Sequence, residues 1–339
     1  MPRFANRSSA DRAALIEEAS ARLDVMPVIV EKDYWVCWTL GRIFGLPDLA
    51  KTLVFKGGTS LSKVFHAIRR FSEDIDLSVS PVSLGFSESD IEDAPSRSRR
   101  AKLFEKMQKE CEAFVAGPCR EALEQAIVGE LGDHATGKPW LEFALDARTN
   151  SPVLSFEYPS TIQAASGYIE QRVKLELGSL TDQKPTGSHS IIPMISEALS
   201  SLEPESATVL ALEVERTFWE KATILHAEYH RPTAHPVPDR FARHYSDFAS
   251  LWNHTSREAA LSRIDLLERV ALLKSRFFGS SWSNYDSART GSLRLTPPEN
   301  RVSEMERDYE KMKPMFLEEP PIFADVLQVL RVAEERINR

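Results

Sequence analysis

Two aspartates separated by one residue are the clearest sign of chemistry in this sequence. Asp74 and Asp76 lie in the segment 71–77, whose alternating pattern predicts a β-strand. Successive side chains of a strand point to opposite faces, so both carboxylates are expected on one face while Ile75 and Leu77 enter a core. Neighbouring carboxylates repel each other, and Mg²⁺ removes that repulsion by taking their oxygens as ligands. The pair therefore indicates a metal site, although an isolated Asp-x-Asp is more often a solvated strand face.

A turn of small residues comes shortly before the two aspartates. It consists of Lys56, Gly57, Gly58 and Thr59. Glycine lets a backbone approach a ligand closely, and a helix predicted from Ser60 to Ile68 follows. We expect Thr59 or Ser60 to cap this helix, whose free N–H groups favour an anion such as a triphosphate. The Gly-Lys-Ser/Thr ending of a P-loop is absent, but the turn, the helix and the paired acids together predict a nucleotide-binding site.

Further strands and helices are predicted around this motif. Strand patterns return in three segments that would extend the same sheet: 141–145, 153–158 and 168–178. In the last of them, Lys174 and Glu176 share one face. Helical patterns occupy 11–23, 27–44, 96–127 and most of the chain after Ser196. The aromatic residues of the second helix are expected to pack in the core rather than stack on a base: Tyr34, Trp35 and Trp38.

Length and composition limit the classes of protein to be considered. The 339 residues exceed one typical compact domain, and 42% hydrophobic with 27% charged residues is typical of a soluble globular protein. No apolar run reaches the roughly 18–20 residues of a membrane span, and the polar start lacks a signal-peptide core. Cys37, Cys111 and Cys119 have no metal-binding spacing and are predicted to be buried, reduced thiols. We therefore expect a cytoplasmic protein with no membrane segment.

The charge pattern leaves the macromolecular partner open. A net charge of −8 argues against general nucleic-acid binding, but not against a local basic groove. A mixed aromatic and basic stretch at 273–295 fits either RNA contact or a loop packed between helices. The first basic cluster is more often a solvated helix face than a nucleic-acid contact, and it comprises Arg97, Arg99, Arg100 and Lys102.

The central motif resembles that of a known enzyme superfamily. Gly-Gly-Thr, a helix and Asp-x-Asp are similar to the signature of the DNA polymerase β-like nucleotidyltransferases. The sequences KGGTSLSK and RFSEDIDL resemble the AbiEii/AbiGii toxin family, to which the MenT-type tRNA nucleotidyltransferases belong. Weaker similarities run from Glu31 to the C-terminus, in EKDYWVCWTLGRIF, LALEVERTFWEKATILHAEYHRP, DRFARHYSDFASLW and DYEKMKPMF.

The resemblance implies an α+β fold in two parts. A polymerase β-like nucleotidyltransferase domain, with a mixed central sheet and flanking helices, is expected over residues 1–195. A mainly helical C-terminal domain is expected over residues 196–339.

The resemblance also implies the residues of the site. Enzymes of this superfamily usually take a third carboxylate from a neighbouring strand, so Glu176 is expected to join Asp74 and Asp76 as a catalytic ligand of Mg²⁺, or of Mn²⁺ in its place. Family motifs give Lys221 a phosphate-binding role and Asp247 a catalytic or orienting role, although isolated helical Lys and Asp side chains are more often solvated. The expected nucleotide-binding residues are Lys56, Gly57, Gly58, Thr59, Ser60, Ser72, Lys174, Lys221 and Arg243.

The implied reaction is metal-dependent nucleotidyl transfer. Two Mg²⁺ ions roughly 3.5–4 Å apart would hold an NTP and an acceptor hydroxyl for in-line attack on the α-phosphate. The resemblance implies the 3′ end of tRNA as the acceptor. It also implies a toxin of a bacterial toxin–antitoxin or phage-defence system, with a cognate antitoxin as partner.

Two alternatives stay open on the sequence alone. One is a nucleotidyltransferase that modifies a protein or a small molecule. The other is a regulator that binds a nucleotide without turnover.

Ser72 suggests a means of regulation. It lies two residues before Asp74, on the same face of the predicted strand. Phosphorylation there would add roughly −1.5 to −2 charges beside the metal site and is expected to block it.

Overall fold

The structure is a computed structural model that describes residues 3–87, 90, 96–162, 169–180, 182–203 and 205–339. Contacts between residues divide the chain into two compact units. Unit 1 comprises Met1–Val64 and Ser72–Ala211, and unit 2 comprises Phe65–Phe71 and Leu212–Arg339. The domain ranges 1–195 and 196–339 stay a prediction.

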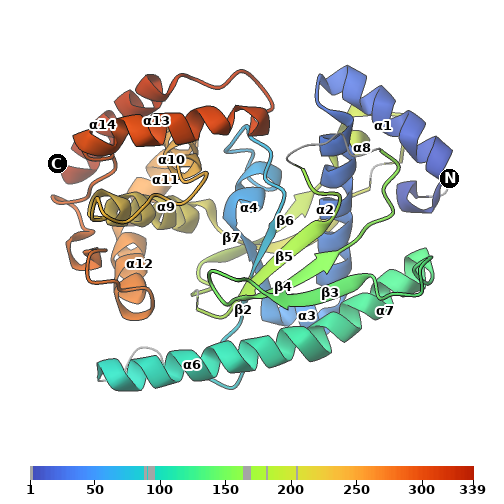
Figure 1. Cartoon of the computed structure of the whole chain (residues 1–339), viewed down its shortest axis with the longest axis horizontal. Helices are drawn as coiled ribbons and strands as arrows, with labels where there is room; N and C mark the ends of the chain where they lie inside the picture. Colours follow the sequence, from blue (N-terminus) through green and yellow to red (C-terminus); the bar gives the residue numbers. More distant parts are fainter. Residues whose placement is uncertain (1–2, 88–89, 91–95, 163–168, 181, 204) are drawn as a thin grey trace. The chain divides into compact units, whose positions relative to one another are not determined.

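Unit 1 is built on a seven-stranded mixed sheet of order β3-β4-β5-β2-β1-β7-β6 (Figure 1). Its strands are β1 (Leu53–Lys56), β2 (Ile75–Val79), β3 (Leu141–Leu145), β4 (Pro152–Phe156), β5 (Val173–Gly178), β6 (Thr186–Ile191) and β7 (Ala207–Leu212). Strand β2 is antiparallel to β1 and parallel to β5, so the central motif lies in the middle of the sheet. The predicted mixed sheet with flanking helices is confirmed.

The helices of unit 1 are α1 (Ser9–Leu23), α2 (Pro27–Gly45), α3 (Pro47–Thr52), α4 (Gly57–Lys63), α6 (Arg97–Phe114), α7 (Arg120–Leu131) and α8 (Met194–Ala198). They include those predicted at 11–23, 27–44 and 96–127, and two short helices, α3 and α8, that were not predicted. A π-helical segment, η2 (Val115–Cys119), joins α6 to α7 in one long rod (Figure 1). Pro118 lies inside this segment and cannot donate a backbone hydrogen bond, which accounts for the local change of helix type.

The core of unit 1 joins α2 to the sheet. Trp35 stacks on Tyr158 with ring centroids 5.6 Å apart, and Trp38 stacks on Phe156 at 5.6 Å. All four rings, and Tyr34, are buried. The aromatic residues of α2 therefore pack in the core as predicted, and so do the three free, buried cysteines.

Unit 2 is mainly helical, as predicted for the C-terminal part. Its helices are α9 (Val214–Tyr229), α10 (Arg243–Asn253), α11 (Arg257–Leu261), α12 (Ile264–Phe277), α13 (Val302–Lys311) and α14 (Phe323–Asn338). Helix α9 packs against α10, α11 and α12, and α14 packs against α10. Strand β7 is an exception to the prediction of helices after Ser196. In the described part of the chain, no helix is long and apolar enough to cross a membrane.

Three predicted element boundaries were wrong around the central motif. Helix α4 ends at Lys63 rather than Ile68, and β2 begins at Ile75 rather than Phe71. The residues between them pair with a distant segment of unit 2, since Phe71 N–H donates to Met315 O at 2.6 Å. Residues 65–71 accordingly belong to unit 2 rather than to the sheet-bearing unit 1. Strand β5 begins at Val173, and the predicted start of this strand, 168, lies outside the described residues.

Candidate active site

Two of the predicted ligands are neighbours across the centre of the sheet. Strands β2 and β5 are parallel, and their register pairs Asp76 with Glu176. Paired residues of adjacent strands present their side chains on the same face, close together. The alternating burial of β5 leaves Lys174 and Glu176 on the more exposed face, as predicted.

Asp74 lies one residue before β2 and shares this acidic environment. Burial, followed by the charges of Glu176, Glu73 and Asp76, raises the pKa of Asp74 to about 6 against the opposing effect of Lys174. Like charges that act on one another at this strength are close in space. Asp74 therefore shares the acidic surroundings of the Asp76–Glu176 pair.

The chemistry of these donors fits a divalent cation. Carboxylate oxygens are the ligands of Mg²⁺, and mutual repulsion among acids is what a cation relieves. Lys174 already supplies positive charge here, because its Nζ contacts Glu176 and lies 3.7 Å from Asp146 Oδ2. Across the described residues, no group of three or more His, Cys, Asp and Glu side chains is gathered tightly enough to hold a metal ion as placed.

The glycine turn presses directly against one carboxylate. Lys56 at the end of β1 pairs with Asp76 in the β1–β2 ladder, and Gly57 follows with a φ of 82°. A Cβ on Gly57 would lie only 1.9 Å from Asp76 Oδ2. Both the left-handed backbone and the missing side chain are therefore required at this position.

The expected helix cap at Thr59 or Ser60 was wrong. Helix α4 begins at Gly57, so its N-cap is Lys56, which makes no side-chain cap. The Ser60 hydroxyl instead donates to Gly57 O at 2.9 Å. Both hydroxyls lie inside the first turn of α4, and both donate to oxygens of unit 1.

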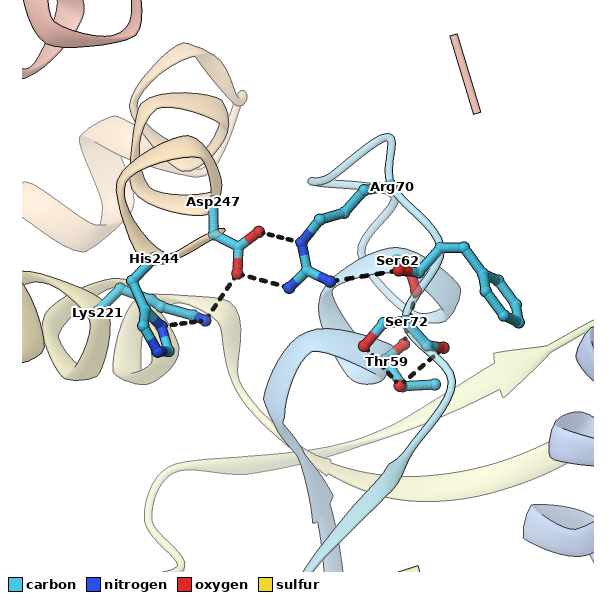
Figure 2. Close-up of polar contacts among 8 residues, drawn as sticks. Thr59, Ser62, Arg70, Ser72, Lys221, His244 and Asp247 are labelled. Atoms are coloured by element: carbon cyan, nitrogen blue, oxygen red, sulfur yellow. Dashed lines mark hydrogen bonds and ion pairs between the residues drawn. The ribbon is translucent and has the colours of Figure 1, made fainter. Parts of the chain in front are cut away.

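Thr59 ties α4 to the segment that enters β2. Its Oγ1 lies 3.1 Å from Ser72 O and 3.0 Å from Ser72 Oγ (Figure 2). The same Oγ1 also contacts Asp74 O. These contacts fix the backbone on both sides of Glu73. Thr59 and Ser72 thereby position the Asp74 carboxylate, which is a role that the sequence had not indicated.

A second cluster lies in unit 2, around the buried Asp247 of α10. Arg70 donates to both Asp247 oxygens, from Nε at 2.7 Å and from Nη2 at 2.8 Å, and Lys221 Nζ donates to Oδ2 at 2.7 Å (Figure 2). The Asp247 side chain is 1% exposed and that of Lys221 8%. The alternative that these are solvated helix-surface residues is therefore wrong.

The cluster holds opposite charges in a buried setting. Burial alone would raise the pKa of Asp247, but Arg70 and Lys221 hold it well below its usual range. Burial lowers the pKa of Lys221, with Arg70 acting in the same direction and Asp247 opposing. Lys221 Nζ also lies 3.2 Å from His244 Nδ1, and burial with the charge of Lys221 lowers the pKa of His244 well below its usual value. His244 is therefore a neutral acceptor for Lys221.

Arg70 is the residue of this cluster that sequence reasoning missed. It is the first residue of RFSEDIDL, a motif interpreted only for its acids and Ser72. Its place within that motif was the available signal. Arg243, a predicted nucleotide ligand, is the first residue of α10 and is partly exposed. Its charge also lowers the pKa of Lys221 and His244.

Comparison with known proteins identifies the family of this chain. Residues 38–329 match the family described as "Nucleotidyl transferase AbiEii toxin, Type IV TA system". The chain therefore belongs to this family of nucleotidyltransferase toxins, which confirms the resemblance in the central motif. No curated protein matches the chain.

Comparison with solved structures gives a match over most of the chain. It is MenT4, a nucleotidyltransferase toxin from Mycobacterium tuberculosis H37Rv, at 13% sequence identity and a TM-score of 0.35. The match covers 91% of this chain and 99% of the MenT4 chain.

Proposed function

We propose that this protein transfers a nucleoside monophosphate from an NTP to an acceptor hydroxyl at the 3′ end of tRNA. The observation that carries the proposal is the pairing of Asp76 with Glu176 on adjacent strands, with Asp74 beside them. Family membership supports nucleotidyl transfer as the class of reaction. The reaction breaks the bond between the α- and β-phosphates, forms a new phosphodiester to the acceptor oxygen and releases pyrophosphate.

The carboxylates and the glycine turn of unit 1 have different roles. Asp74, Asp76 and Glu176 would hold Mg²⁺, or Mn²⁺, which neutralises phosphate charge and activates the acceptor hydroxyl when bound. Gly57 brings backbone against Asp76, so a phosphate near the acids also lies near the turn. Thr59 and Ser72 hold the Asp74 segment in place.

The remaining predicted ligands of unit 1 lie on the same strands and turn. Lys174 projects on the face of Glu176, and Lys56 precedes the turn. Their charges suit the β- and γ-phosphates, because fixed cations stabilise developing charge without reorganisation. Gly58 and Ser60 are buried beneath the turn, so we assign them to its shape.

Lys221 supplies a phosphate-binding cation from unit 2. Asp247 holds its ammonium group by a charged hydrogen bond, and Arg70 holds Asp247 through two more. His244 accepts from Lys221 and leaves it one further N–H for a ligand. Arg243 adds a second, more exposed cation on α10.

The biological setting is part of the same proposal. We propose that the protein acts in the cytoplasm as the toxin of a toxin–antitoxin or phage-defence system, and that a cognate antitoxin is its protein partner. The family's description as a type IV toxin system supports this setting. Modification of a tRNA 3′ end would prevent aminoacylation and so account for toxicity.

The test mixes the purified protein with Mg²⁺, total bacterial tRNA and each α-labelled NTP in turn. Asp74→Ala/Asp76→Ala is the inactive control, and Glu142→Ala, which removes an exposed acid from β3, is the matched control. We expect label on tRNA with the wild type and Glu142→Ala only. Pyrophosphate release with a crude lysate but no labelled tRNA would favour a protein or small-molecule acceptor. No turnover in either assay would leave the nucleotide-binding regulator.

A further inference from the structure

Helix α6 carries a line of cations along one exposed face. Arg99, Lys102, Lys106 and Lys109 are three or four residues apart, which places them on a single face of a helix. All four are exposed. With a rise of about 1.5 Å per residue, this α6 stripe is about 15 Å long.

The opposite face of α6 fixes the orientation of the stripe. Met107 and Cys111 are buried, and Ser179 Oγ donates to Met107 O at 3.2 Å. Helix α6 packs against β5, the strand that carries Glu176. The α6 stripe therefore points away from the core of unit 1 on a helix anchored to a strand of the candidate site.

The stripe is only partly neutralised by acidic side chains. In the part of the chain that the structure describes, Lys109 with Glu105 at 2.9 Å is its only ion pair. The first turn of α6 has no acidic residue, although the positive end of the helix dipole favours acids there. Like charges three or four residues apart also repel. Because the net charge of the protein is −8, its overall composition does not explain four cations on one helix face.

We propose that the α6 stripe binds the phosphate backbone of the acceptor RNA. This inference rests on the proposed function and assigns a surface to its substrate. Spaced cations contact phosphates and position a nucleic acid without reading its sequence. Lysine is depleted in protein–protein interfaces, whose centres need aromatic or apolar anchors, and this exposed face has none. The ammonium group of Lys106 also lies over the Phe86 ring, with its Nζ 5.3 Å from the ring centroid.

The experiment removes three charges of the stripe and measures RNA binding without NTP. The variant is Arg99→Gln/Lys102→Gln/Lys106→Gln, because glutamine keeps helix propensity. The matched control removes three exposed cations elsewhere, in Lys51→Gln/Lys138→Gln/Arg331→Gln. The probe is labelled total bacterial tRNA, titrated by fluorescence anisotropy over a series of salt concentrations.

We expect the stripe variant to bind tRNA more weakly than the control variant at low salt, by roughly tenfold or more. The slope of log K against log salt should fall by roughly two to three, because each lost phosphate contact removes roughly 0.7–0.9. Its KM for tRNA in pyrophosphate release should rise while kcat is kept. Its thermal midpoint should equal or exceed that of the wild type, since repulsion is removed.

Equal slopes for the two variants would overturn the proposal. So would tRNA binding that is unchanged while polyglutamate binding falls, which would make the stripe a surface for an acidic protein. Stripe-dependent tRNA binding without any nucleotide transfer would keep this inference and overturn the proposed function. Transfer to tRNA that is insensitive to the stripe would do the reverse.

Discussion

Asp76 leaves no room for a side chain on Gly57. The carboxylate Oδ2 lies 1.9 Å from the point where a Cβ would be, and Gly57 has a φ of 82°. Gly85 has a similar φ of 86° but nothing within 4 Å of its Cβ position. The two glycines share a backbone conformation and differ in their surroundings. A comparison of alanine variants at the two positions therefore distinguishes the effect of backbone strain from the effect of displacing Asp76.

Replacement of Gly57 by alanine should remove activity as well as stability. Both Gly57→Ala and Gly85→Ala place an L-residue in a left-handed conformation, which should lower the free energy of unfolding by about 1–2 kcal/mol. Only Gly57→Ala displaces Asp76, so its transfer rate should fall on the order of 100-fold while Gly85→Ala keeps its rate. Urea unfolding and labelled-NTP transfer measure the two effects. Equal rates for the two variants would contradict a role for the close approach.

Neutralising one acid of the site should abolish transfer without weakening the fold. Asp76→Asn and Glu176→Gln remove charges that repel others nearby, so the metal-free thermal midpoint should stay the same or rise. Transfer should fall on the order of 100-fold or more. Mg²⁺ should raise the midpoint of the wild type and of Glu142→Gln, but not of the two site variants. A chelator should reverse the rise. A shared response to Mg²⁺ in all four proteins would count against the site.

Lysine should not be able to replace Arg70. Arg70→Lys keeps the charge but not the pair of hydrogen bonds to Asp247, so transfer should fall at least about tenfold with the fold intact. Arg70→Ala should cost about 3 kcal/mol or more, because Asp247 stays buried with one fewer partner. In a double-mutant cycle with Asp247→Ala, the two losses should be far from additive. Additive losses would show that the pair does not act as a unit.

His226 should make the stability of unit 2 depend on pH. Its Nδ1 accepts from Arg294 N–H at 3.0 Å, and burial lowers its pKa to about 4. The unfolded value is about 6.5, so between these values the unfolded state binds more protons. The free energy of unfolding should therefore fall by about 2–3 kcal/mol as pH drops through that window, with no further change from this group below it.

Denaturant unfolding across this pH range measures the effect. His226→Gln should lose most of the slope, whereas His235→Gln, which changes an exposed histidine, should retain it. A slope that is the same in both variants would assign the pH dependence to other groups.

A negative charge at Ser72 should inhibit transfer. Ser72 is partly buried, its Oγ is 3.0 Å from Thr59 Oγ1, and it lies two residues before Asp74. Ser72→Glu adds charge beside the carboxylates and should inactivate the protein, whereas Ser72→Ala, which loses only the contact with Thr59, should be impaired far less. Ser87→Glu, a change at an exposed serine, serves as the control. Full activity of Ser72→Glu would end the hypothesis that phosphorylation regulates this site.

Local patterns carried much of the fold and part of the site. The alternation in 173–177 placed Lys174 and Glu176 on one face, and the burial preference of aromatic side chains predicted that Tyr34, Trp35 and Trp38 pack in the core. Such periodicity is set by the backbone of each element, so it can be seen in the sequence alone. The family resemblance rested on the same short segments and was confirmed over residues 38–329.

Contacts between distant segments were decided only by the tertiary structure. The register that sets Asp76 beside Glu176 joins residues one hundred positions apart, and the ion pair of Arg70 with Asp247 spans 177. The sequence suggested each acid but not the arginine, because a buried charge is visible only once its surroundings are known. The backbone pairing of Phe71 with Met315 likewise joins residues far apart in the sequence. Local propensity determined which elements form, and long-range pairing determined which side chains meet.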